Sequence, residues 1–323
     1  MSLFKARKAE RKALVIGFTN YEQADRIPGI RKSAFAIKNV LKEHYDKTPN
    51  FDVQLMTESS KGVLPYRSEK DLRRQITGFL RSGRKADTGI LYVISHGSKP
   101  SVSQPPCFVF PGLPGSGTDI FIPMEDVAEE VNKSRFGNLV VVIDCCYAGS
   151  FVSEMDQPLR SGVSILTSSH DDEYSFGDYF PYTQSYTLFS GFMKAALTWK
   201  AADNLTGVTT LASVYDFLCQ NLGAAQHPVL RCNATTFLPL RQNRPNYTPE
   251  QMQLIHDCFC PPDGLRPGLS AALRSKLEAA MPGLIENYLV KERTAGKAAL
   301  LPKPEYTLTA KGRRLWDLVE LRS

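Results

Sequence analysis

The sequence predicts an α/β fold in which helices flank a mostly parallel β-sheet, followed by a small separate domain. Short runs of β-branched and aliphatic residues, at 90–95 and 139–143, end at polar or glycine residues, as buried parallel strands do. Segments with helical apolar spacing alternate with such runs from residue 13 to about residue 239. This alternation is typical of a parallel sheet covered by helices.

The helices and loops follow from local patterns in chain order. Apolar residues recur with helical spacing in 37–41, 71–80 and 124–131. Residues 98–118 are rich in Ser, Pro and Gly and predict a long loop, and 153–162 predicts a second one. Both loops adjoin the polar motifs described below, so we expect them to form rims around a site.

Composition excludes several classes of protein. The 323 residues suffice for one large domain and a smaller one, with 42% hydrophobic and 22% charged residues. The longest aliphatic runs reach about five residues, against about 20 needed to cross a membrane. The first twelve residues are basic and lack the apolar core of a signal peptide. The seven cysteines show no secreted disulfide framework, so we expect a cytoplasmic protein with reduced thiols.

Two polar motifs stand at the ends of predicted strands. His96-Gly97 follows the run 90–95, and the segment 144–149, Asp-Cys-Cys-Tyr-Ala-Gly, follows 139–143. Reactive groups collect at the carboxyl ends of parallel strands. A thiol is mostly protonated near pH 7, and a histidine with a pKa of about 6.5 can take that proton. The pair predicts a cysteine nucleophile with a histidine base, and the backbone N–H groups of Gly97 and Cys146 predict an oxyanion hole.

These motifs resemble those of the caspase-like cysteine peptidases, and the metacaspase and prokaryotic branch more than the animal caspases. The family's His-Gly and Asp-x-Cys-x-x-Gly motifs match 95–97 and 144–149. Further similar segments are the first strand 13–17, the helix entry 27–34, the strand 165–169 and the helix start 185–189. Ser33 stands where the family usually has Asp. The resemblance covers about residues 12–245 and implies a caspase-like fold.

The resemblance also implies which cysteine reacts. The family nucleophile lies three residues before the motif's glycine, which selects Cys146 and leaves Cys145 to the core. Strand alternation puts the two side chains on opposite faces without deciding which faces the crevice. In caspases, activation involves cleavage in the region that corresponds to 153–162 here. This segment contains Arg160. We expect one uncut chain here, with a single nick at Arg160 as the alternative.

Acidic residues near the nucleophile predict a pocket for a basic substrate residue. Asp144 precedes Cys146, and Asp171 and Asp172 follow the strand that ends at Ser168. Carboxylates on both sides of a crevice favour a cationic side chain, and the metacaspase resemblance implies the same. Acidic runs are often solvated loops, so which of Asp171 and Asp172 points inward stays open. We expect cleavage after Arg and, less efficiently, Lys, with these residues and Ser168 binding the substrate.

Residues 246–323 predict an accessory domain beside the peptidase domain of residues 1–245. Residues 250–259 and 269–289 have helical patterns, and 306–316 is similar to the end of winged-helix modules, with Thr309 as a helix cap. The segment has 11 Lys and Arg against 9 Asp and Glu, too little excess for a nucleic-acid footprint. A docking module for a regulatory protein partner is therefore favoured over DNA binding.

The function predicted from these residues is a cysteine endopeptidase acting on protein substrates. The alternatives are an inactive caspase-like scaffold and a DNA-associated regulator. We expect no membrane association, no metal site and no cofactor; calcium has weak support, since Glu154 and Asp156 fall short of its usual 6–8 oxygen ligands. The resemblance to prokaryotic members implies a role in stress or defence, controlled by a partner or a signal.

Overall fold

The computed structural model describes the following residues: 9–99, 104–153, 158–177, 186–203, 206–223, 226–234, 238–245, 248–260, 264–286, 290–293, 305–309, 313 and 316. The chain divides into two compact units, Met1–Arg244 and Pro245–Ser323. This division falls beside the predicted domain boundary, whereas the roles of the two domains stay predictions. No helix within these ranges is both long and apolar enough to cross a membrane.

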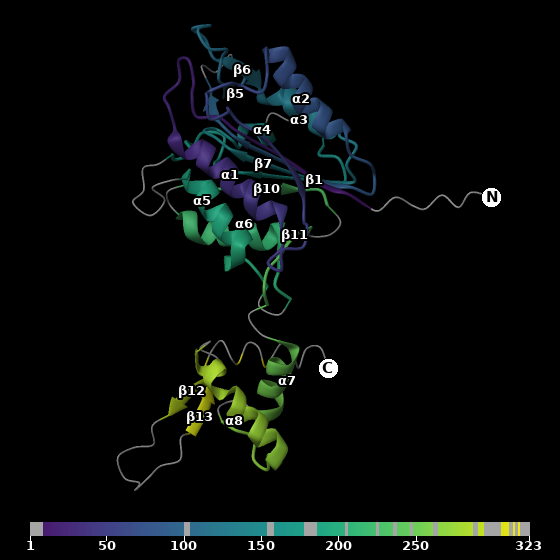
Figure 1. The fold of residues 1–323 in the computed structure, drawn as a ribbon, viewed down its shortest axis with the longest axis vertical. Helices are drawn as coiled ribbons and strands as arrows, with labels where there is room; N and C mark the ends of the chain where they lie inside the picture. Colours follow the sequence, from purple (N-terminus) through teal and green to yellow (C-terminus); the bar gives the residue numbers. More distant parts are fainter. Residues whose placement is uncertain are drawn as a thin grey trace, which may run out of the picture. The chain divides into compact units, whose positions relative to one another are not determined.

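A six-stranded sheet forms the centre of the first unit (Figure 1). Its order is β10 (Val229–Cys232), β8 (Val163–Thr167), β7 (Asn138–Asp144), β3 (Thr88–Ile94), β1 (Arg11–Gly17) and β2 (Asp52–Met56). All neighbours pair in parallel except β10, which runs antiparallel to β8 at one edge. The predicted mostly parallel sheet is therefore confirmed.

Helices cover both faces of this sheet (Figure 1). One face carries α2 (Glu69–Arg81) and α3 (Met124–Asn132); the other carries α1 (Pro28–Lys42), α5 (Leu188–Ala195) and α6 (Leu211–Leu222). Strand β1 shows why, because Leu14 packs in the core under α2 while its neighbour Val15 packs in the core under α1. A strand buried on both faces needs a continuous apolar run, which is the pattern in its sequence.

The rest of the first unit consists of short elements. A π-helical turn, η1 (Ala196–Lys200), continues α5. The short helix α4 (Ser150–Ser153) follows the motif at 144–149, and β9 (Val208–Thr210) pairs with β11 (Pro239–Gln242). The prediction of one long loop over 98–118 was wrong. Within it β5 (Cys107–Phe110) pairs with β4 (His96–Ser98) on one side and β6 (Ile120–Pro123) on the other. The four residues of β5 are all buried, and this core packing offsets the loop-like composition around them.

The elements described for the second unit are the helices α7 (Pro249–Cys258) and α8 (Ala271–Glu286) and the antiparallel strands β12 (Val290–Arg293) and β13 (Glu305–Leu308). Thr248 and Gln251 form a capping box at the start of α7. The indole N–H of Trp316 lies 3.1 Å from the carbonyl of Phe259, and its ring stacks on His256. The winged-helix likeness of this unit stays a prediction.

Candidate active site

The two predicted motifs lie side by side at the carboxyl ends of β3 and β7. Ile94 pairs in register with Asp144, and the N–H of Ser95 donates to the Asp144 carbonyl at 3.1 Å. Two residues farther along, a Cβ added to Gly97 would overlap the carbonyl oxygen of Cys146. The glycine therefore permits a backbone approach that brings the residue after His96 against the candidate nucleophile.

The two adjacent cysteines occupy different environments. Cys145 is 2% exposed and packs in the core beneath α2 and α3. Its carbonyl accepts hydrogen bonds from the hydroxyls of Ser168 and Ser169 at 3.2 and 3.3 Å. Cys146 is half-buried, and its thiol lies 3.7 Å from the carbonyl oxygen of Ser175. A thiol without access to solvent cannot meet a peptide, so the geometry favours Cys146.

A strained turn presents Cys146. Tyr147, which follows it, has φ 58°, a left-handed conformation that is unusual for a bulky residue. Its N–H donates to the Glu173 carbonyl at 2.7 Å, and a Cβ on Gly149 would clash with the backbone of His170 and Asp171. The segment after β8 thus holds the turn in a conformation that the local sequence disfavours.

Burial raises the pKa of the Cys146 thiol, and backbone hydrogen bonding at Ser175, then at the amides of Cys146 and Gly97, partly opposes that shift. Those amides interact favourably with negative charge at the sulfur. They are the two groups that the sequence predicted for the oxyanion hole. A thiol with a raised pKa is mostly protonated near pH 7, so it needs a base to become a nucleophile.

His96 is oriented by the chain around Asp25. Its Nε2 lies 2.7 Å from the Asp25 carbonyl oxygen, which can only accept a hydrogen bond, so Nε2 carries a proton. In the neutral ring the lone pair is then on Nδ1, the atom left to act as a base. Tyr21 packs edge-on against the imidazole, with ring centroids 4.7 Å apart.

Asp119 fixes the loop that carries this carbonyl. Its buried carboxylate accepts the backbone N–H groups of Glu22, Gln23 and Ala24 at 2.7, 3.1 and 2.8 Å. Sequence reasoning missed both Asp25 and Asp119. The role of Asp25 resides in its backbone carbonyl, which no side-chain motif reveals, and Asp119 lies almost a hundred residues from the loop it holds.

Asp144 is a buried carboxylate surrounded by hydroxyl groups. It is 2% exposed and accepts hydrogen bonds from Ser175 at 2.9 Å and from Thr187 and Ser190 at 2.6 Å. Burial raises its pKa, and these hydroxyl bonds oppose the rise. Ser33, which replaces the family's Asp, lies 3.3 Å from the Thr187 hydroxyl. A serine there keeps the network without a second buried carboxylate.

The other predicted pocket residues differ in exposure. Ser168 is fully buried, and its hydroxyl bonds to the Cys145 carbonyl rather than facing solvent. Asp171 is half-buried and Asp172 is exposed. In the described part of the chain, the hydrogen-bond partners of the Asp144 carboxylate are Ser175, Thr187 and Ser190, so this carboxylate is not bonded to either of those aspartates. Their role in substrate binding stays a prediction.

Arg160, the candidate site for a nick, is tied to its surroundings. Its guanidinium donates to the carbonyls of Ser161 and Phe136 at 2.9 and 2.8 Å, and its own carbonyl accepts the N–H of Val163. Cleavage there would require these bonds to open, which favours the uncut chain. Glu154 and Asp156, considered for calcium, lie outside the described residues.

Part of the chain matches a known protein family. The model of the Peptidase C13 family matches residues 69–229, a range that includes both His96 and Cys146. This range, just under half of the chain, is therefore similar to a family of cysteine peptidases. This caspase-like peptidase is thus a cysteine-type endopeptidase, as the sequence predicted; its assignment to the metacaspase branch stays a prediction.

The fold of this caspase-like peptidase is similar to that of caspase-1 from Spodoptera frugiperda. The likeness covers 73% of this chain and 92% of that chain, with a TM-score of 0.50 and 11% sequence identity. At that identity the comparison bears on the fold alone. No curated protein matches the chain in sequence.

Proposed function

We propose that this peptidase uses Cys146 as nucleophile and His96 as general base, and cleaves protein chains after Arg and, less efficiently, Lys. The observation that carries the dyad is the packing of Gly97 against Cys146, which sets the two motifs together at the ends of β3 and β7. The tautomer that Asp25 imposes supports the same roles, because it leaves Nδ1 of His96 as the acceptor.

The reaction then follows the chemistry of acyl transfer. Nδ1 of His96 takes the Cys146 proton as the sulfur attacks the scissile carbonyl carbon. The resulting oxyanion accepts hydrogen bonds from the backbone amides of Gly97 and Cys146. The imidazolium returns the proton to the leaving amine, and the C–N bond breaks to give a thioester. Water, deprotonated by the same imidazole, hydrolyses that thioester and releases the carboxylate.

The preference for a basic residue rests on Asp144. Its carboxylate is buried, and the partners described for it are hydroxyl groups, which stabilise an anion less than a cation does. Ser175 connects it to the nucleophile, since its hydroxyl binds Asp144 while its carbonyl lies beside the Cys146 thiol. A guanidinium entering beside Ser175 would supply the missing positive charge, with Asp171 and Asp172 available at the rim.

Fluorogenic peptides ending in Arg, Lys or Asp test this function on the full chain. The Arg peptide should be cleaved fastest, and Cys146→Ala should abolish cleavage while Cys219→Ala, at an exposed cysteine on α6, should not. Faster cleavage of the Asp peptide would refute the pocket assignment. Equal loss of activity in both cysteine variants would refute Cys146 as the specific nucleophile.

We further propose that residues 246–323 dock a regulatory protein partner rather than DNA, in a cytoplasmic stress or defence pathway. The near balance of 11 basic and 9 acidic residues supports this choice. Fluorescence anisotropy of labelled duplex DNA with the full chain should reveal no binding at about 0.15 M salt, where electrostatic contacts are screened. Salt-resistant binding would favour the DNA-associated regulator instead.

A further inference from the structure

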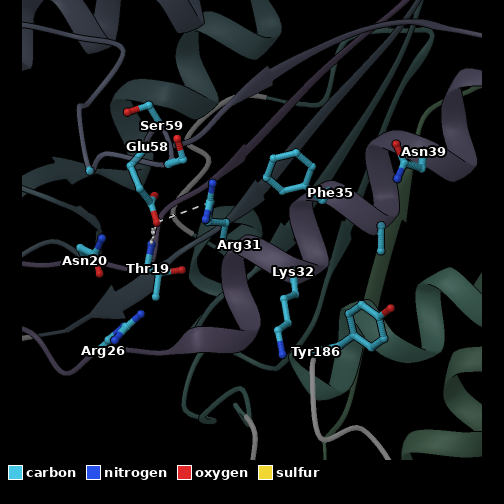
Figure 2. A pocket seen from close by; sticks show the side chains of 13 residues that line it. Thr19, Asn20, Arg26, Arg31, Lys32, Phe35, Asn39, Glu58, Ser59 and Tyr186 are labelled. Carbon is cyan, nitrogen blue, oxygen red and sulfur yellow. Dashed lines mark hydrogen bonds and ion pairs between the residues drawn. The ribbon is translucent and has the colours of Figure 1, made fainter.

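A cavity of about 710 Å³ opens where β1 and β2 end, along the side of α1 from Arg31 to Asn39 (Figure 2). Its described walls do not include Cys146 or His96, so it is distinct from the dyad. Its lining includes three cationic side chains, a carboxylate, a phenyl ring and a threonine hydroxyl, from Arg26, Arg31, Lys32, Glu58, Phe35 and Thr19.

The charge of this cavity is unusual for the start of a helix. The N-terminus of a helix carries partial positive charge, which acidic residues normally offset. The first turn of α1 has no acidic residue, and its N-cap, Ile27, gives no side-chain hydrogen bond. Instead Arg31 and Lys32 lie in or next to this turn, and Arg26 precedes it. The first turn of α1 and the three cationic side chains therefore both favour an anionic ligand.

The one carboxylate in the wall is largely engaged in holding the fold. Glu58 is 3% exposed; both its oxygens lie 3.3 Å from the Thr19 N–H, and one accepts the Thr57 hydroxyl at 3.2 Å. Arg31 approaches it only to 4.0 Å. Within the described part of the chain, Nε of Arg31 and the hydroxyl of Thr19 have no hydrogen-bond partner. In this described wall, Arg31 and Thr19 thus each present a polar group that the carboxylate of Glu58 does not satisfy.

An aromatic surface lies beside the cations. Phe35, one turn after Arg31 on α1, is 39% exposed, and the guanidinium of Arg31 lies 5.4 Å from its ring centroid. Figure 2 shows Arg31 between Glu58 and Phe35. The cavity volume falls within the range of small-molecule sites, about 300–1,000 Å³. Cations beside a partly exposed ring suit a ligand with phosphates at one end and a flat aromatic group at the other.

We propose that this cavity binds a nucleotide, with its phosphates against Arg26, Arg31 and Lys32 and its base against Phe35. Arginine recognises phosphate oxygens through paired N–H donors. An acidic peptide would also neutralise these cations, but its carboxylates would offer no flat group to stack on the ring of Phe35. The combination of charge and ring favours the nucleotide.

The cavity is connected to both halves of the proposed active site. Arg26 directly follows Asp25, whose carbonyl orients His96. Tyr186, also in the cavity wall, directly precedes Thr187, which donates to Asp144. A ligand in the cavity would contact Arg26, next to the residue whose carbonyl orients His96. It would also contact Tyr186, next to the residue that donates to Asp144. We therefore expect the bound nucleotide to regulate cleavage. This expectation rests on the proposed Cys146–His96 dyad.

Isothermal titration calorimetry of the full chain tests binding independently of catalysis, since it can use Cys146→Ala. ATP should bind, inorganic tripolyphosphate should bind more weakly, and adenosine and tetraglutamate should not bind at 1 mM. Arg31→Ala should weaken ATP binding about tenfold, the loss expected for one charge-assisted contact. Phe35→Ala should weaken ATP binding and leave tripolyphosphate binding unchanged.

Controls keep this test decisive. Arg74→Ala, at an exposed arginine on α2, should bind ATP like the parent. If Arg31→Ala unfolds by circular dichroism, Lys32→Gln replaces it, with the same expected direction. Absent ATP binding, binding of tetraglutamate alone, or affinity unchanged in the Arg31 and Phe35 variants would each overturn the proposal. With active chain, ATP should increase turnover of the Arg peptide; if ATP binds and turnover does not change, the regulatory part fails and the site stands.

Discussion

Two buried carboxylates, at opposite ends of the central sheet, are satisfied in different ways. Asp87, directly before β3, is fully buried. Its carboxylate accepts hydrogen bonds from Nε and Nη2 of Arg84 at 2.9 and 2.7 Å, and a third from the N–H of Glu10. Asp144, at the end of β7, has three hydroxyl partners. The side-chain hydrogen bond from Arg84 lowers the pKa of Asp87 to about 2, whereas burial raises the pKa of Asp144.

Under the proposed function, the contrast separates a structural carboxylate, Asp87, from a substrate-binding one, Asp144. Asp87 already has its cation and joins the segment before β1 to the loop before β3. Asp144 holds a buried charge whose described partners are neutral, which costs stability unless a cation arrives. In the proposed function the substrate brings that cation. Substitutions at the two positions should therefore affect different properties.

The largest expected effect is on catalysis. Asp144→Asn should reduce kcat/KM for an Arg peptide about 100-fold, because the substrate guanidinium loses a buried charged partner. Asp87→Asn should leave kcat/KM within about twofold when it is assayed well below its melting temperature. Steady-state kinetics on both variants measures the difference, and an equal loss in both would remove the distinction between them.

The next effect is on stability. Asp87→Asn should lower the free energy of unfolding by about 2 kcal/mol, the cost of a lost charge-assisted hydrogen bond in a buried site. Urea titration followed by circular dichroism checks this, with Asp172→Asn as an exposed control that should change little. A stability equal to the parent's would show that the Arg84 pair adds nothing.

The pH dependence of unfolding has a definite sign. The folded pKa of Asp87 is lowered from its usual value near 4 to about 2. Its contribution to stability is therefore present above pH 4 and is lost as the pH falls through about 2. Melting temperatures should fall more steeply between pH 4 and 2 in the parent than in Asp87→Asn. Parallel curves in that window would contradict the assignment.

A smaller effect is expected on the nucleophile. Burial and the nearby Asp144 charge both raise the pKa of the Cys146 thiol. In a His96→Ala background, Asp144→Asn should move the pH midpoint of Cys146 alkylation by iodoacetamide to lower pH, and Asp87→Asn should not move it. Mass spectrometry of the modified peptide follows Cys146 alone. A midpoint that does not move would mean that Asp144 carries no negative charge beside the thiol.

The sequence predicted the sheet well because its strands are buried on both faces, and such strands keep their apolar character over their full length. Strand β5 was missed because four apolar residues within a Ser-, Pro- and Gly-rich stretch give too short a signal. What that strand buries depends on contacts with β4 and β6, which only the folded chain brings together.

The site was predictable where side chains carry the chemistry and less so elsewhere. The motifs around His96 and Cys146 mark two strand ends that the sheet places side by side. The carbonyl of Asp25 leaves no side-chain signature, and the hydroxyls around Asp144 come from segments 31 to 46 residues away. Such networks depend on tertiary packing rather than on local pattern.

The central claim is that Asp144 recognises a positive charge next to the Cys146–His96 dyad. It is tested most directly by comparing peptides that end in Arg with peptides that end in citrulline, which keeps the shape of arginine without its charge. We predict a kcat/KM ratio of at least about 100 in the parent, falling to about 10 or less in Asp144→Asn, since a buried charge pair is lost. A ratio near one in the parent, or a ratio that is the same in the variant, would contradict the claim.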